Sequence, residues 1–269
     1  MTGEFQDKNI LITGASKGLG SVCAKSFEKQ GARLVLAARS VDKLEQLKKS
    51  FSDPSKHLTF AGDLTDQKNI EDLVNKGFEH TGGFDIVLHV LGGGYGFRDP
   101  LPTWDQLDTL HKVNVGVAAE VNRLVSPEMV KKRSGRLVHV GSIASYEATG
   151  SVGYNTVKSA LAAYVRSLGR ELAESGVIVN GALPGAFYAP GNSWRRLEVD
   201  KPEVVREVIA KNLPRKKIAD ANEILPLIFF LAGEAASMMS GCCVPIDAGE
   251  GKSYIVKDYI KPKENNGAI

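Results

Sequence analysis

The fold of this chain is decided by a glycine-rich stretch, Thr13-Gly14-Ala15-Ser16-Lys17-Gly18-Leu19-Gly20. It follows the apolar run Asn9–Thr13, which indicates a buried strand, and it opens the helical pattern Leu19–Gln30. Glycines are needed where the backbone turns tightly and approaches a pyrophosphate. The free N–H groups and the dipole at the start of the helix favour anionic oxygens. A strand, a glycine turn and a helix in this order predict a dinucleotide-phosphate site.

The alternation of short apolar runs and longer helical patterns continues along the chain. Continuous apolar runs suit a parallel sheet covered on both faces, with helices as right-handed crossovers. The expected strands are Asn9–Thr13, Arg33–Ala37, Leu58–Phe60, Asp85–Val90, Arg136–Val140, Val177–Gly181 and Cys243–Ile246. The expected helices are Leu19–Gln30, Val41–Ser50, Gln67–His80, Thr103–Lys132, Gly153–Ser175 and Ala221–Gly233, with Pro202–Asn212 outside the sheet pattern. Within Thr103–Lys132 the helical period of apolar residues is interrupted. This stretch is therefore either one helix or a short helix followed by a longer one.

The fold class is therefore α/β, a single Rossmann-type domain with a doubly wound parallel sheet of about seven strands. We expect the domain to span residues 1–256, with a substrate loop at about 186–215 and a loose polar tail at 257–269. With 269 residues, one such domain is the economical interpretation.

Composition narrows the classes of function. The net charge of +3 argues against a nucleic-acid binder, which needs clustered cations. No apolar run approaches the roughly 20 residues that span a bilayer, and the polar N-terminus lacks a signal peptide, so we expect a cytoplasmic protein without a membrane partner. The three cysteines show no metal-ligand spacing and no disulfide framework, and no metal is expected.

A candidate acid/base pair begins the helix after the fifth strand. Tyr154 and Lys158 are four residues apart, so both project from one helix face. A nearby ammonium favours phenolate, which leads us to expect a lowered Tyr154 pKa. The preceding strand ends at Ser142, where sheet ligands bind, and Ser145 is a rival for the same role.

These motifs together resemble the short-chain dehydrogenase/reductase family, over about Lys8 to Gly249. The glycine turn has the family's T-G-x-x-x-G-x-G spacing, Tyr154 and Lys158 form its Y-x-x-x-K, and Pro184-Gly185 resembles its turn facing the nicotinamide. The resemblance implies hydride transfer between nicotinamide and a carbonyl or alcohol, with Tyr154 as acid/base, Ser142 positioning the oxygen and Lys158 binding the ribose. It also implies that Asn114 helps hold a water that serves a proton relay through Lys158.

The residues after the second strand bear on which cofactor is used. An NAD site usually places a carboxylate there, but position 38 is alanine and Arg39 follows. Together with Lys17, Arg39 suits a 2′-phosphate, so NADP(H) is favoured over NAD(H). By resemblance Asp63 meets the adenine, although it could equally cap the next helix. The expected cofactor set is Gly14, Ser16, Lys17, Gly18, Leu19, Gly20, Arg39, Asp63, Leu64, Gly92, Tyr154, Lys158, Pro184 and Gly185.

Two departures from the family pattern stand out. His89 replaces the first asparagine of an N-N-A-G motif, and it is either a brace or a satisfied core histidine. No threonine follows Pro184-Gly185 within the next few residues, which puts one contact to the carboxamide in doubt. Neither departure removes a proton-transfer group.

The substrate is open at this stage. Phe187, Tyr188, Trp194, Arg195 and Arg196 lie in a segment able to close over the site, and Gly93–Phe97 is expected to line the opposite wall. The two arginines suit an anionic substrate, and the resemblance favours a 3-oxoacyl thioester, as for a 3-oxoacyl-ACP reductase. Alternatives are a sugar, a polyol or another secondary alcohol, or a regulator that binds NADP(H) without turnover. The resemblance also implies a homo-oligomer, either a dimer or a tetramer.

Overall fold

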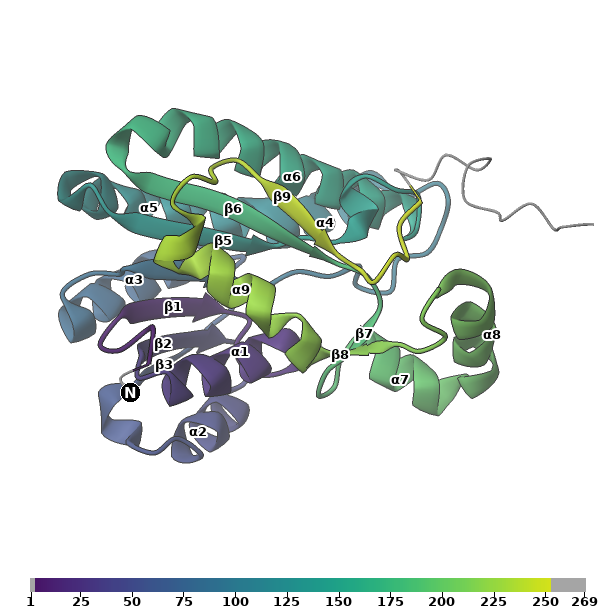
Figure 1. Ribbon diagram of the computed structural model, residues 1–269, viewed down its shortest axis with the longest axis horizontal. Coiled ribbons are helices and arrows are strands. Elements are labelled where there is room, and N and C mark those ends of the chain that lie inside the picture. The colour runs from purple at the N-terminus through teal and green to yellow at the C-terminus, as the bar shows by residue number, and fades with distance from the viewer. Residues whose placement is uncertain (1–2, 253–269) are drawn as a thin grey trace, which may run out of the picture.

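The computed structural model describes residues 3–252, and in this part of the chain seven strands form one parallel sheet (Figure 1). The strands are β1 (Asn9–Thr13), β2 (Arg33–Ala38), β3 (Leu58–Ala61), β4 (Ile86–His89), β5 (Gly135–Val140), β6 (Val177–Pro184) and β9 (Cys243–Ile246). Their order in the sheet is β3-β2-β1-β4-β5-β6-β9. The order reverses between β1 and β4, and a crevice for ligands forms at the carboxyl ends of strands at such a point. The predicted doubly wound sheet is confirmed.

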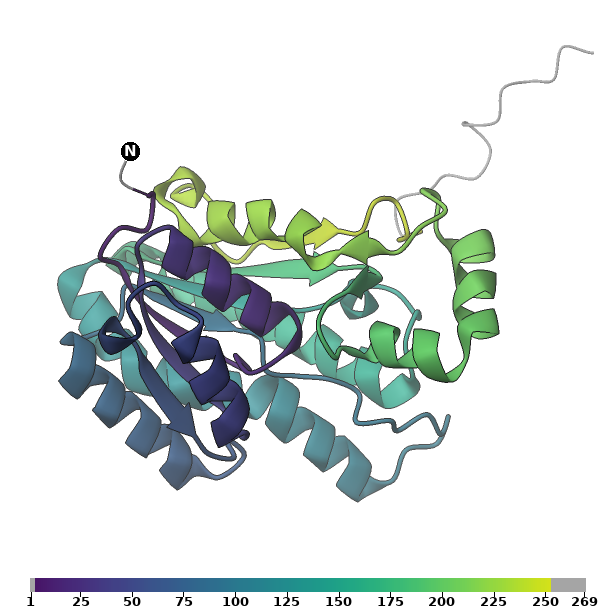
Figure 2. The same cartoon turned by 90° about the horizontal axis from the view of Figure 1, so that it is seen from below.

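The two faces of the sheet follow from the alternation of side chains along each strand. Ile10 and Ile12 of β1 belong to one buried cluster, and Leu11 belongs to the other. The first face is covered by α1 (Gly18–Lys29), α2 (Val41–Lys49) and α9 (Leu225–Ala232). The second is covered by α3 (Gln67–Thr81), α5 (Val117–Lys132) and α6 (Val152–Leu172). In Figure 2, α9 lies above the sheet and α3 below it.

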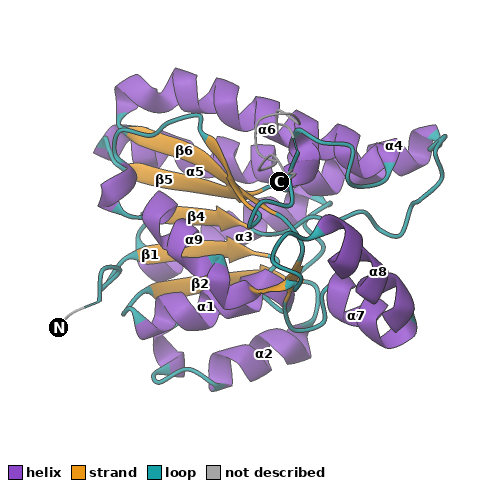
Figure 3. Cartoon of the chain, turned by 45° about the vertical axis from the view of Figure 1, so that its right-hand side comes forward, coloured by secondary structure: helices purple, strands orange, loops and turns teal. Residues whose placement is uncertain are grey.

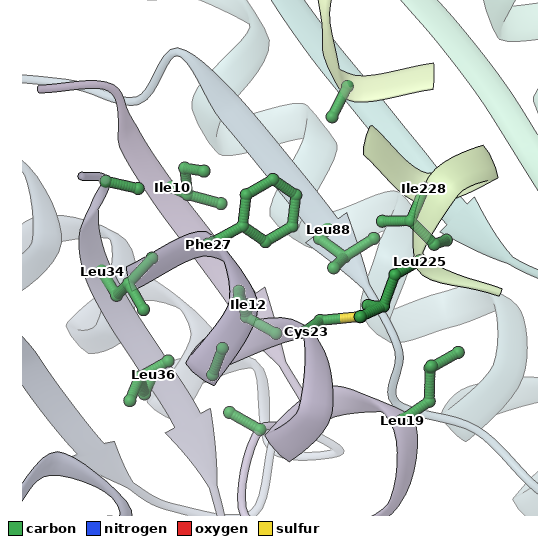
Figure 4. Close-up of a cluster of buried hydrophobic side chains, with 14 of the residues drawn as sticks. Ile10, Ile12, Leu19, Cys23, Phe27, Leu34, Leu36, Leu88, Leu225 and Ile228 are labelled. Carbon is green, nitrogen blue, oxygen red and sulfur yellow. The ribbon is translucent and has the colours of Figure 1, made fainter. Parts of the chain in front are cut away.

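The glycine turn is anchored by the apolar face of α1. Cys23 and Phe27 are fully buried, and Figure 4 shows them among side chains from the sheet and from α9. This burial places the first turn of α1 directly after the carboxyl end of β1.

The segment expected as one helix or two consists of three parts. The first part is α4 (Trp104–His111), whose N-terminus is capped by a capping box of Thr103 and Gln106. A π-helical turn, Lys112–Gly116, follows and leads into α5. Such turns often occur at functional sites, and this one contains Asn114. The change from α- to π-helical geometry also interrupts the helical period of the sequence.

The segment expected as a substrate loop is largely regular. After β7 (Phe187–Tyr188) come α7 (Ser193–Asp200) and α8 (Pro202–Asn212), and β8 (Ala219–Asp220) pairs with β7. Asn192 caps α7, and apolar side chains of both helices share a small core with Ala186, Leu213 and Ile218. The segment expected as a substrate loop at about 186–215 thus contains two helices, of which α8, at Pro202–Asn212, was predicted from the sequence. Figure 3 shows both helices beyond the carboxyl ends of the strands.

Helix α6 carries the predicted acid/base pair and packs tightly on the sheet. A Cβ at Gly169 would lie 2.3 Å from the backbone nitrogen of Gly241 and 3.1 Å from the carbonyl oxygen of Val179. We expect Gly169→Ala to lower the free energy of unfolding by about 2 kcal/mol, because backbone atoms must move. Urea denaturation checks this result, and Ser167→Ala on the exposed face of α6 is the control, expected within about 0.5 kcal/mol of the wild type. Equal stability of the two variants would contradict the close packing.

Within residues 3–252, no helix combines the length and the apolar character needed to cross a bilayer. The expected polar tail at 257–269 lies outside the described residues.

Candidate active site

Two hydroxyl groups meet at the carboxyl end of β5. Ser142 directly follows the strand and begins a 3₁₀ turn, in which its Oγ accepts from the N–H of Ala144 at 3.1 Å. The same side chain is hydrogen-bonded to the hydroxyl of Tyr154, in the first turn of α6. The rival Ser145 is buried and donates to the carbonyl oxygen of Lys158 at 2.9 Å. Ser142 therefore faces the phenol, whereas Ser145 anchors the helix.

Lys158 lies beneath the phenol and is only 3% exposed. Its Nζ donates to the carbonyl oxygen of Val140 at 3.2 Å and lies 5.7 Å from the centroid of the Tyr154 ring. Burial lowers the pKa of Lys158 to about 8, because the ammonium loses hydration.

The expected lowering of the Tyr154 pKa was wrong for this structure. Burial raises the pKa of Tyr154, and the hydrogen bond with Ser142 opposes this rise. Lys158 donates to the backbone of β5 and not to the phenol oxygen, so it adds no hydrogen bond that would favour the phenolate. The phenol is therefore protonated at neutral pH and is in the state that can donate a proton.

Asn114 braces the glycine-rich loop after β4. Its Nδ2 donates to the carbonyl oxygens of Gly93 at 3.0 Å and Leu110 at 2.9 Å, and its Oδ1 accepts from the N–H of Gly93 at 3.0 Å. Both amide protons are thus used within the protein, so the side chain could hold a water only through its oxygen.

Gly92 brings these residues together. A Cβ at this position would lie 2.7 Å from Asn114 Oδ1 and 3.1 Å from Lys158 Nζ. Gly94 approaches the phenol, because its Cβ would lie 3.6 Å from Cδ2 of Tyr154. The glycine run after β4 thus borders the acid/base pair, and small residues leave room there.

The glycine turn after β1 has the geometry of a phosphate cradle. Gly14 has a φ of +72°, and a Cβ there would lie 2.9 Å from the backbone nitrogen of Leu91. Gly20 is equally close-packed, since its Cβ would meet the carbonyl oxygen of Gly14. Gly18 is the first residue of α1, whose N-terminal end therefore points at the crevice, and Ser16 and Leu19 flank it. The turn fits the pyrophosphate of a dinucleotide.

Four cations surround the mouth of this turn. Lys17 and Arg39 were expected there, whereas Lys43 of α2 and Arg196 of α7 were missed. Burial lowers the pKa of Lys17, and the positive charges of Arg196, Lys43 and Arg39 lower it further. Lys43 follows Arg39 by four residues and was detectable in the sequence, whereas Arg196 comes from a distant segment. This set fits a cofactor that carries an additional phosphate.

Asp63 and Leu64 lie after β3. Asp63 Oδ1 accepts from the N–H and Oγ1 of Thr65, at 3.0 and 2.8 Å. These hydrogen bonds, the backbone one above all, lower the pKa of Asp63. The cap of α3 is Asp66, so Asp63 does not serve as the cap. Leu64 is buried at 2% exposure and packs in the second core cluster.

Carboxylates border the Pro184–Gly185 turn. Glu250 accepts from the N–H of Ala186, and burial raises the pKa of Glu250, while the charges of Asp247 and Glu147 act in the same direction. The two arginines expected to attract an anion are separated. Arg195 lies 2.9 Å from Glu198 and stacks over Tyr188, while Arg196 donates to the Gly191 carbonyl and its charge lowers the pKa of Lys17.

His89 belongs to a buried network below the site. Its Nε2 donates to Oδ1 of Asn122 at 2.8 Å, and Nδ2 of Asn122 donates to Nε2 of His139 at 3.3 Å and to the hydroxyl of Tyr164 at 3.1 Å. The two imidazoles stack with centroids 4.5 Å apart. His89 thus braces β4 against α5 and β5.

Comparisons with known proteins agree with this arrangement. The family described as short chain dehydrogenase matches residues 8–198. Oxidoreductase UcpA of Salmonella typhimurium is 30% identical over 257 residues, which cover 92% of this chain and 95% of that protein. Glucose 1-dehydrogenase of Gluconobacter oxydans is 30% identical over 254 residues, which cover 91% of this chain and 92% of that protein.

A solved structure extends the likeness to the fold. L-Sorbose reductase from Gluconobacter frateurii, complexed with NADPH and L-sorbose, is 26% identical and superimposes with a TM-score of 0.84. The superposition covers 93% of this chain and 98% of that one. The chain belongs to the short-chain dehydrogenase family, and it is an NAD(P)-dependent oxidoreductase that acts on CH–OH/C=O groups.

Proposed function

We propose that this protein is an NADP(H)-dependent reductase of a small, neutral, hydroxylated carbonyl compound, with Tyr154 as the proton donor. The observation that carries the proposal is the pairing of the Tyr154 and Ser142 hydroxyls above the buried ammonium of Lys158. The cation cluster at the glycine turn supports NADP(H), as does the NADPH complex of L-sorbose reductase.

The chain's own groups divide the chemistry among them. Tyr154 donates its proton to the carbonyl oxygen, and Ser142 donates a hydrogen bond to the same oxygen, which stabilises the charge that develops there. Lys158 binds the ribose hydroxyls, and the Gly92–Gly94 loop, held by Asn114, sets the wall of the site. When bound, the dihydronicotinamide supplies the hydride. The protonated phenol is the form that donates a proton when a carbonyl is reduced.

The charges near the site support a neutral substrate. Glu147, Asp247 and Glu250 lie around the Pro184–Gly185 turn and repel an anionic carrier, while carboxylates accept hydrogen bonds from hydroxyl groups. Arg195, which could attract an anion, is paired with Glu198. A sugar or polyol-type ketone is therefore favoured over a 3-oxoacyl thioester, and the names of glucose 1-dehydrogenase and L-sorbose reductase support the same class.

The test is NADPH oxidation at pH 7 over a ketose, a simple hydroxyketone, an apolar ketone and acetoacetyl-CoA. We expect the highest kcat/KM with a hydroxylated ketone. A higher value with acetoacetyl-CoA would contradict the proposed substrate class. NADPH binding without turnover of any carbonyl would favour a regulator instead.

Cofactor choice gives a further prediction. We expect Arg39→Ala to raise the KM for NADPH about tenfold and to leave the KM for NADH nearly unchanged, because one charge-assisted hydrogen bond to a 2′-phosphate is lost. Steady-state kinetics with both cofactors check this result. Arg33→Ala is the matched control, since Arg33 lies at the opposite end of β2 and pairs with Asp7. A parallel rise for both cofactors in Arg39→Ala would refute 2′-phosphate recognition by this residue.

A further inference from the structure

The segment after β6 is tied directly to the glycine turn. The N–H of Gly18 donates to the carbonyl oxygen of Pro190 at 2.8 Å. Asn192 then caps α7 by accepting from the N–H of Arg195 at 3.0 Å, and it donates to the carbonyl oxygen of Phe187 at 2.7 Å. The start of α7 is thus held beside the start of α1, as the views in Figures 1 and 3 agree.

Arg196 is held at this junction. Its guanidinium donates to the carbonyl oxygen of Gly191, the residue that follows Pro190. Arg196 is also the charge that acts most strongly on Lys17, ahead of Lys43 and Arg39. Among residues 3–252, none of these four cations forms an ion pair with a carboxylate. They therefore repel one another, and a bound phosphate would relieve the repulsion.

The neighbouring Arg195 shows that this arrangement is specific to one residue. Its guanidinium lies 3.9 Å from the centroid of the Tyr188 ring and 2.9 Å from Oε2 of Glu198. One turn of α7 thus carries two different arginines. Arg195 is paired with a carboxylate and an aromatic ring, whereas Arg196 is hydrogen-bonded to the Gly191 carbonyl beside the glycine turn and forms no ion pair among the described residues.

We propose that Arg196 binds a phosphate group of the cofactor, so that the segment over the substrate side also holds the adenosine side of the same dinucleotide. A guanidinium offers a planar fork of donors that matches phosphate oxygens. The cofactor would thereby add a second tie between α7 and the glycine turn, beside the hydrogen bond from Gly18 to Pro190, and would help hold the substrate segment in place. This inference rests on the NADP(H) use proposed above.

The test is equilibrium binding of NADPH and of NADH, followed by nucleotide fluorescence or by calorimetry, to the full-length wild type, Arg196→Ala and Arg195→Ala. We expect Arg196→Ala to raise the Kd for NADPH about five- to tenfold, and Arg195→Ala to change it less than about twofold. An unchanged Kd for NADH assigns the 2′-phosphate to Arg196, whereas an equal rise for NADH assigns the pyrophosphate. Either result supports the proposal.

An unchanged Kd for NADPH in Arg196→Ala, or an equal loss in Arg195→Ala, would overturn it. Both side chains are exposed on α7, so unchanged thermal unfolding is expected and excludes a folding defect. The binding assay uses no carbonyl substrate, so its outcome is independent of the substrate class. If the wild type turns over no carbonyl but loses NADPH affinity in Arg196→Ala, the proposed activity fails and this inference stands.

Discussion

Replacing Tyr154 with phenylalanine is expected to lower kcat/KM for carbonyl reduction by about 10²- to 10⁴-fold. The substitution removes the hydroxyl that we propose as the proton donor, and with it the hydrogen bond to Ser142. The ring remains, so the packing against the Gly94 loop is kept. Stopped-flow or steady-state assays at saturating NADPH give the rate, and fluorescence titration gives the NADPH Kd, which we expect to stay within about twofold of the wild type.

A matched control lies ten residues further along the same helix. The hydroxyl of Tyr164 bonds Asn122 in the core rather than Ser142. Tyr164→Phe is expected to destabilise the fold by about 1 kcal/mol while keeping most of the activity. If Tyr154→Phe kept more than about a tenth of the wild-type kcat/KM, Tyr154 would not be the proton donor.

Acidification is expected to destabilise the protein through the stacked imidazoles of His89 and His139. Both side chains are buried, at 4% and 0% exposure, and Asn122 bonds one ring nitrogen of each. The other ring nitrogen, Nδ1, has no partner among the described residues. A proton on either ring would therefore create a buried charge next to a second imidazole, and the charge of Lys158 acts on His139 as well.

The direction of the effect follows from the pKa values. Burial lowers the pKa of His89 from the usual 6.5 to about 4, and burial moves the pKa of His139 in the same direction. Between these values the unfolded chain binds a proton that the folded chain does not. The free energy of unfolding is thus unaffected by the titration of these histidines above about pH 6.5, and it falls as the pH is lowered toward 4. For His89 alone this amounts to about 3 kcal/mol by pH 4.

Urea denaturation at pH 7, 5.5 and 4.5 measures this dependence. In His89→Asn, the new amide can still donate a hydrogen bond to Asn122 but has no basic nitrogen. The free energy of unfolding of this variant should therefore fall less steeply between pH 7 and 4.5 than that of the wild type. Parallel curves for His89→Asn and the wild type would show that His89 does not titrate in this way.

Local patterns in the sequence were sufficient for the sheet and the helices that cover it. The bounds of β1 and β9 were predicted to the residue, because continuous apolar runs between glycines and polar turns leave little freedom. The helix over Ser193–Asp200 was not predicted from the sequence, and the cause is again local. This helix buries its apolar side in a small cluster with α8, β7 and nearby loop residues rather than on the main sheet, so its pattern is weak and Pro190 suggested a loop.

The sequence by itself determined which groups stand at the carboxyl ends of the strands, since a glycine turn after β1, Ser142 after β5 and Tyr154 with Lys158 on one helix follow from spacing and periodicity. Only the tertiary structure decided how those groups are charged and what surrounds them. Burial raises the pKa of Tyr154 although an ammonium lies nearby, and α7 brings Arg196 to Lys17 from 179 residues away along the chain. The physical reason is that desolvation and long-range charge depend on what packs around a group, and adjacent residues in the sequence do not contain that information.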